Sequence, residues 1–179
     1  AQAPAAGTDN ASLAPKDAGV WASLSTDTEG SQWKDLQAFL DKIPGGQNAL
    51  DQIAKSVAKS TDGLDLRKDV LPALGKTVVV VVPKDAADPV VLVRPADTRK
   101  LDALLAKQSP KPVTGETDGW TAIAKDKAAL DAYTTALAAG RLSDNADFTK
   151  AVSSLPSEAL ALVYVDGAAV AKAASGAAG

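Results

Sequence analysis

Six consecutive β-branched residues, TVVVVV at positions 77–82, constrain the fold of this chain more than any other segment. Such side chains favour extended backbone, and an uninterrupted run of them is typical of a strand covered on both faces. A short loop at 84–89 separates this run from a second valine-rich segment at 90–93, which predicts an antiparallel neighbour. We therefore expect residues 77–82 to form a central strand of a sheet.

Apolar periodicity predicts the remaining elements. Alternating or short apolar segments indicate strands at 19–25, 112–116, 120–124 and 159–165, and the Asp118-Gly119 dipeptide favours a tight hairpin turn. Apolar residues spaced by three and four indicate helices, which we expect at 31–43, 47–59, 98–105, 127–139, 145–154 and 166–172, with a short helical or turn segment at 65–74. The predicted fold class is α+β, a mainly antiparallel sheet of about five or six strands with helices packed chiefly on one face.

The ends of the chain differ in composition from its body. Residues 1–13 are rich in Ala, Pro, Gly and Thr without periodicity, which predicts a flexible leader, and residues 173–179 predict a flexible tail. Residues 14–172 are then a single α+β domain.

Two segments of the body resemble each other. Residues 15–18, with sequence PKDA, lead into the first expected strand, and residues 156–159, with sequence PSEA, lead into the last one. Each strand also ends at a polar capping residue, Ser25 or Asp166. A match over about eleven residues can be a true repeat or a chance similarity. If it is a repeat, the chain holds one full unit and the start of a second.

The chain contains no Cys, His or Met. The missing Cys and His exclude disulfides, thiolate zinc sites and catalytic triads that need an imidazole or thiol. Because residue 1 is not Met, we expect the chain to be a processed product or a cloned fragment. The small residues of the opening segment AQAPAAG resemble those that follow a signal-peptidase cut, and we expect an exported protein.

Charge and hydropathy limit the classes of partner that we expect for this chain. The net charge is −3 and the lysines are spread singly, which argues against a nucleic-acid partner. No apolar run approaches the ~20 residues that a membrane span requires. We expect that any membrane tether lies in a missing N-terminal segment.

The passage from Gly63 to Gly75 carries a resemblance to a known family. It contains Gly63-Leu64-Asp65 and then Asp69-Val70-Leu71-Pro72-Ala73-Leu74-Gly75 before the valine strand. This order resembles the bacterial family known as domain of unknown function (DUF) 3352, and the likeness extends to Leu155-Pro156 and to the strand end Tyr164-Val165-Asp166. Ala73 replaces the family's usual Trp, and the chain is far shorter than typical members. The resemblance implies a secreted or envelope-anchored protein and supplies no catalytic residues.

Candidate chemistry is sparse. Acidic residues cluster at 62–69, 27–29 and 144–147, but none of these segments matches a calcium loop, and each precedes an expected helix, where carboxylates are favourable. Ser56 and Lys59 match the bare Ser-x-x-Lys pattern, yet they lie at the end of an ordinary amphipathic helix. We predict no catalytic residue, no metal site and no cofactor.

Three tryptophans, Trp21, Trp33 and Trp120, are the least explained residues. Trp21 lies opposite the alternating apolar face of its strand, and Trp120 begins a hairpin strand. One interpretation places them in the core under helices; the other makes Trp21 and Trp120 exposed contacts for a partner.

These observations favour a non-enzymatic, extracytoplasmic interaction or scaffold domain, either secreted or anchored in the cell envelope, whose partner is an unknown protein or apolar ligand. An alternative is a carrier that holds a lipid or other apolar ligand between sheet and helices, which requires a large apolar cavity. A third hypothesis is an unrecognised hydrolase, which requires a cleft with a Ser or Thr beside a Lys or carboxylate.

Overall fold

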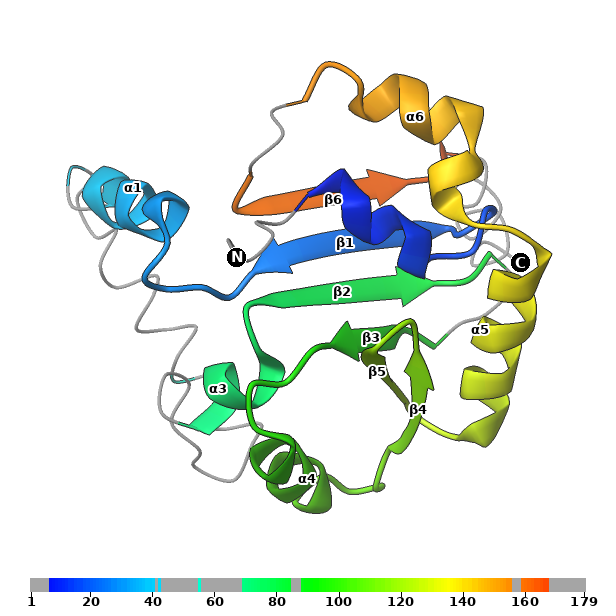
Figure 1. Ribbon diagram of the computed structural model, residues 1–179, viewed down its shortest axis with the longest axis horizontal. Coiled ribbons are helices and arrows are strands. Elements are labelled where there is room, and N and C mark those ends of the chain that lie inside the picture. The colour runs from blue at the N-terminus through cyan, green and yellow to red at the C-terminus, as the bar shows by residue number, and fades with distance from the viewer. Residues whose placement is uncertain are drawn as a thin grey trace, which may run out of the picture.

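The computed structural model describes residues 7–40, 42, 55, 69–84, 88–155 and 159–167. Its centre is a six-stranded antiparallel sheet with the strand order β4-β5-β3-β2-β1-β6, so the fold class is α+β (Figure 1). The strands are β1 (Val20–Ser25), β2 (Thr77–Val82), β3 (Val90–Val93), β4 (Val113–Thr117), β5 (Trp120–Ala124) and β6 (Ala161–Val165). The helical elements are η1 (Thr8–Leu13), α1 (Ser31–Leu40), α3 (Leu71–Leu74), α4 (Thr98–Ala106), α5 (Lys127–Ala139), η3 (Leu142–Asp144) and α6 (Ala146–Val152).

The valine-rich strand β2 is central, as its sequence predicts. It pairs with β1 on one side and with β3 on the other. Val79 and Val81 are fully buried on one face of the sheet, and Val78 is buried on the opposite face. Burial on both faces explains why this strand carries no polar alternation.

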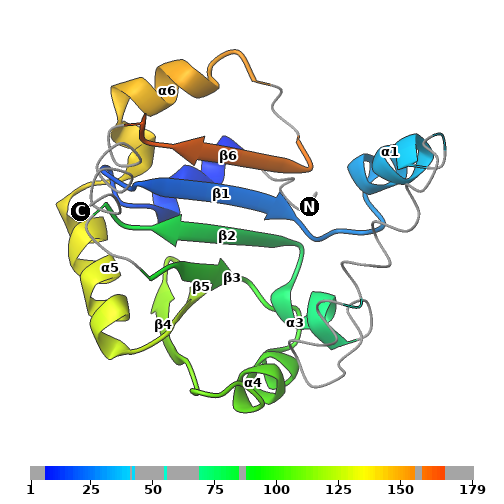
Figure 2. The same ribbon diagram turned by 180° about the vertical axis from the view of Figure 1, so that it is seen from behind.

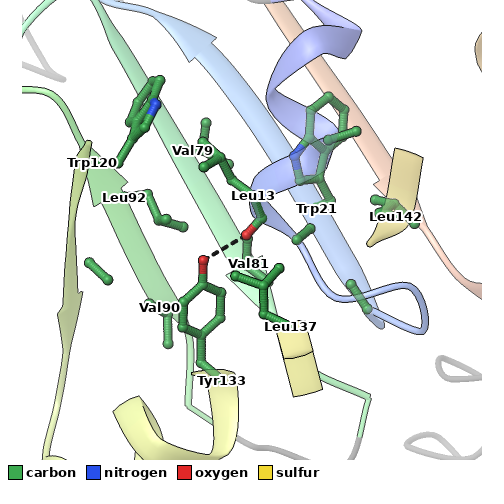
Figure 3. Close-up of a cluster of buried hydrophobic side chains, with 14 of the residues drawn as sticks. Leu13, Trp21, Val79, Val81, Val90, Leu92, Trp120, Tyr133, Leu137 and Leu142 are labelled. Atoms are coloured by element: carbon green, nitrogen blue, oxygen red, sulfur yellow. Dashed lines mark hydrogen bonds between the residues drawn. The ribbon is translucent and has the colours of Figure 1, made fainter. Parts of the chain in front are cut away.

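The larger core lies on one face of the sheet, beneath η1, α5, η3 and α6. Tyr133 and Leu137 of α5 pack there against the inward side chains of the strands (Figure 3). Phe148 of α6 belongs to the same cluster. α5 approaches β4 closely, because a Cβ placed on Gly115 would lie 3.1 Å from a methyl carbon of Leu130. A glycine at this position therefore lets the helix pack on the edge of the sheet.

A smaller cluster lies on the opposite face. Leu101 and Leu105 of α4 pack with Ala73 of α3 against Val78 and Val93. Most of the helical cover is thus on one face, and α3 and α4 cover part of the other.

The N-terminal segment differs from the prediction of a flexible leader over residues 1–13. Residues 8–13 form η1, in which Ala11 and Leu13 are buried in the main core. Asn10 is also buried and donates a 3.2 Å hydrogen bond to the Ser23 hydroxyl of β1. The prediction was wrong here because one short stretch of 3-10 helix carries too few apolar residues to show a period.

Polar side chains cap the N-terminal ends of three helices. Asp97 caps α4 by accepting from the Arg99 amide, and Asp126 caps α5 by accepting from the Ala129 amide. α6 is capped by Asn145, which accepts from the amides of Asp147 and Phe148. The helix expected at 47–59 lies outside the described residues except for Lys55, and the one expected at 166–172 lies outside them beyond residue 167, as does the tail at 173–179.

Backbone with positive φ shapes the chain at the β4–β5 turn and at Gly75. Asp118 (φ 50°) and Gly119 (φ 74°) form the tight turn between β4 and β5 that their dipeptide predicts. Gly75 (φ 81°) lies between α3 and β2, where a Cβ would come within 2.0 Å of the Arg94 carbonyl oxygen. Gly75 therefore allows the close passage of two chain segments.

Candidate interaction surface

Trp21 lies in the core rather than on the surface. Its side chain is 0% exposed, and its ring meets that of Phe148 edge to face at 5.4 Å between centroids. The indole nitrogen donates a 3.4 Å hydrogen bond to the Asn10 carbonyl oxygen. Trp21 takes this position because alternate residues of β1 point to the face that η1 and α6 cover.

Trp120 is also buried, with 7% of its area exposed. The Arg94 guanidinium lies over its ring, 5.0 Å from the ring centroid. Trp33 of α1 is half-buried and donates a 2.9 Å hydrogen bond to the Ser25 carbonyl oxygen. The structure thus favours the core interpretation for Trp21 and Trp120 and corrects the alternative that made them surface contacts.

Apart from Leu155, the large apolar side chains that are exposed in the described residues lie on the opposite side of β1 and β6. We name this surface the β1–β6 face; it consists of Val20, Ala22, Leu24, Ala161, Val163 and Val165. Val163 is 67% exposed, Val165 45% and Leu24 41%. Figure 2 shows β1 and β6 from this side, with η1 behind them.

The pairing of β1 with β6 brings these side chains together. Leu24 pairs with Ala161, Ala22 with Val163, and Val20 with Val165. Leu24 and Val163 are therefore diagonal neighbours on one surface, within reach of a single partner group. The β1–β6 face is a continuous apolar strip across two strands.

The outer edge of β6 adds backbone groups to this surface. Ser25 donates through its amide to the Leu160 carbonyl, and Asp166 donates through its amide to the Gly19 carbonyl. In an antiparallel strand, each residue directs both its N–H and its C=O group to one side, and the next residue directs both to the other side. Ala161, Val163 and Val165 consequently direct theirs away from β1, towards an edge that no described strand occupies.

The two edge strands of the sheet differ in how well their sequences prevent pairing with a further strand. β4 contains Glu116 and follows Lys111 and Pro112, and charges and proline are the usual means by which edge strands avoid unwanted pairing. β6 has no charged residue or proline from Ala161 to Val165. Its sequence is suited to pairing, and this is the signal by which sequence reasoning could have found the edge.

The side of β6 that faces the core is different in character. Tyr164 packs edge to face on Phe148 at 5.1 Å between ring centroids. Burial raises the pKa of the Tyr164 phenol, and the carboxylates of Asp166 and Asp147 raise it further. This side of the strand is anchored by α6, whereas its other side is open.

A polar pocket lies at the junction of β1 and β2. It has a volume of about 220 Å³, and its lining includes Thr26, Asp27 and Lys76. The Thr26 hydroxyl donates a 2.6 Å hydrogen bond to the Gly75 carbonyl, and Lys76 pairs with Asp27 at 3.0 Å. The Thr26 proton is thus held by a main-chain carbonyl and not by a base that would activate this hydroxyl as a nucleophile.

A second pocket, of about 200 Å³, lies beside α4 and is lined by Asp69, Lys100, Ala103, Leu104 and Lys107. Both pockets are smaller than the roughly 300 to 1,000 Å³ of typical ligand sites. Within the described ranges, no group of three acidic side chains gathers closely enough to hold a metal ion. The strands β1 and β6 therefore carry the strongest candidate surface in this part of the chain.

None of the helices in the described part of the chain has the length and apolar character that a membrane span requires. Comparison of the chain with family models, curated proteins and solved structures finds no match.

Proposed function

We propose that this chain is a non-enzymatic interaction or scaffold domain that acts outside the cytoplasmic membrane, as a secreted or envelope-anchored protein, and that it contacts its partner through the β1–β6 face. The observation that carries the proposal is the exposure of Leu24, Val163 and Val165 on one side of two paired strands. Exposed apolar strips of this kind commonly mark contact surfaces.

The proposed partner is a protein with a complementary apolar surface. The face is open and lies on a sheet, so it resembles half of a sheet packing interface more than a cavity that encloses a small molecule. The extracytoplasmic location rests on the resemblance to the DUF3352 family.

Site-specific photo-crosslinking tests this function. A benzoylphenylalanine residue replaces Val163 in the protein expressed in its native host. A matched control places the same residue at Ala138, which is exposed on α5. We expect a discrete protein adduct in the envelope or secreted fraction from position 163 and none from position 138.

A second variant tests whether the adduct depends on the face itself. Leu24→Lys places a charge beside Val163 without changing the position of the crosslinker, so it should reduce the adduct at least tenfold. Equal adducts from positions 163 and 138, or no adduct from either, would contradict the proposed function. An adduct with the mass of a lipid would instead favour the carrier alternative.

A further inference from the structure

The pairing of β1 with β6 has a symmetry that matches the internal similarity of the chain. Ala18 and Ala159 are equivalent in that similarity, so Ala22 and Val163, each four residues later, are also equivalent. Ala22 pairs with Val163 in the sheet. A residue that pairs with its own equivalent across an antiparallel ladder lies on a local two-fold axis.

The neighbouring pairs obey the same symmetry. Trp21 pairs with Tyr164, and its equivalent Leu162 pairs with Ser23, which is the equivalent of Tyr164. All four residues point to the helix-covered side of the sheet, as a two-fold axis perpendicular to the sheet requires. Every antiparallel ladder has such an axis; specific to this one is that the axis falls near the middle of both β1 and β6 and that equivalent residues share a face of the sheet.

If β6 is equivalent to β1, the strand that pairs with the far edge of β1 should have a counterpart at the free edge of β6. The edge of β1 that faces away from β6 pairs with β2, through Ala22 opposite Val80. The equivalent edge of β6 is the outer one, to which Val163 directs its backbone groups. No described strand pairs with this edge, and β6 carries no charged residue that would hinder pairing.

We propose that β6 is the first strand of a second unit of this architecture, and that its outer edge binds an antiparallel, valine-rich strand of the β2 type supplied by that unit. The inference deepens the proposed function, on which it rests for the availability of β6. The sheet then continues through β6 with the two-fold axis between Ala22 and Val163.

The symmetry fixes the register of the incoming strand. In the pairing of β1 with β2, Val20 lies opposite Val82, Ala22 opposite Val80 and Leu24 opposite Val78. Replacing each β1 residue by its equivalent in β6 gives the three pairs expected with the incoming strand. In these, Ala161 lies opposite position 82, Val163 opposite position 80 and Val165 opposite position 78 of the β2-type strand. A slip of one residue would turn the apolar side chains to the other face.

A peptide of this chain's own β2 tests the proposal in trans. The probe is the fluorescently labelled nonapeptide of residues 76–84, KTVVVVVPK, added to the full chain, and binding is measured by fluorescence anisotropy. The control peptide carries N-methyl groups on Val80 and Val82, which removes two of the amide donors that face β6. We expect the control to bind at least tenfold more weakly than the probe.

Disulfide trapping tests the register. The chain has no cysteine, so Val163→Cys introduces a single thiol, and peptides carry one cysteine at position 78, 80 or 82. We expect trapping at position 80 to exceed the other two at least fivefold. Absence of peptide binding, equal binding of the methylated control, or preferred trapping at another position would overturn the proposal. So would a predominant disulfide between the introduced thiols of two chains in the presence of peptide.

The two proposals fail separately. If the peptide does not bind but position 163 still crosslinks to a protein in the envelope, the edge assignment is wrong and the proposed function stands. If the peptide binds in register but no adduct forms in the host, the apolar face has no external partner.

Discussion

The Tyr133 hydroxyl donates a 2.7 Å hydrogen bond to the carbonyl oxygen of Leu13, 120 residues earlier in the chain. Both residues are buried, and the bond joins α5 to the end of η1 (Figure 3). Arg141, just after α5, strengthens the same junction, since its guanidinium donates to the Ser12 carbonyl and pairs with Asp118 at 2.7 Å. The N-terminal segment is therefore part of the folded domain from residue 8 onwards.

Leu13→Ala should lower the free energy of unfolding by about 2 to 4 kcal/mol, because it leaves a cavity in the main core. Leu155 is 45% exposed and provides a matched control. Leu155→Ala should change the free energy by less than about 1 kcal/mol. Urea denaturation followed by tryptophan fluorescence measures both. Equal effects of the two substitutions would show that η1 is a dispensable leader after all.

Stability should fall at high pH through Tyr133. Burial raises the pKa of this phenol from 10.0 to about 12. The neutral phenol is thus favoured in the folded state, and its contribution is complete below pH 10. As pH rises from 10 to 12 the unfolded chain releases the proton first, and about 2 to 3 kcal/mol is lost.

The variant Tyr133→Phe isolates this effect from the titration of lysines. Urea denaturation at pH 9, 10 and 11 should show a steeper decline for the native chain than for the variant. Parallel declines would mean that the Tyr133 phenol titrates equally in the folded and unfolded states.

Gly75→Ala should destabilise the chain by at least about 2 kcal/mol. Gly75 combines a positive φ with a Cβ position 2.0 Å from the Arg94 carbonyl oxygen, so the backbone of one segment must move. At Gly167 a Cβ would meet nothing within 4 Å. Gly167→Ala should leave the thermal midpoint within about 2 °C of the native value, and a similar loss in both variants would refute the close passage of residues 75 and 94.

Much of the fold could be predicted from local sequence patterns. The valine run of β2, the Asp118-Gly119 hairpin and the helix from Lys127 to Ala139 all carry signals within a few residues. These signals depend on backbone preference and periodicity, which tertiary contacts did not override.

The candidate surface was harder to predict because both faces of β1 are apolar. Trp21 and Leu24 lie on opposite faces, and the sequence of the strand does not say which face the helices cover. The structure resolves this, since η1 and α6 cover the side of Trp21. The same ambiguity applies to β6, where Leu162 is buried and Val163 is exposed. Such choices depend on contacts between segments far apart in the chain, and no local period records them.

Amide hydrogen exchange along β6, measured by NMR on the isolated chain, tests most directly the claim that this strand offers an open edge and face. The amides of Leu162 and Tyr164 point to β1 and should be protected at least about a hundredfold, whereas those of Val163 and Val165 should exchange nearly as fast as in an unfolded peptide. Addition of the nonapeptide of residues 76–84 should then slow Val163 and Val165 selectively. Protection of Val163 and Val165 equal to that of Leu162 in the isolated monomeric chain would mean that the edge is already paired, and would contradict the account.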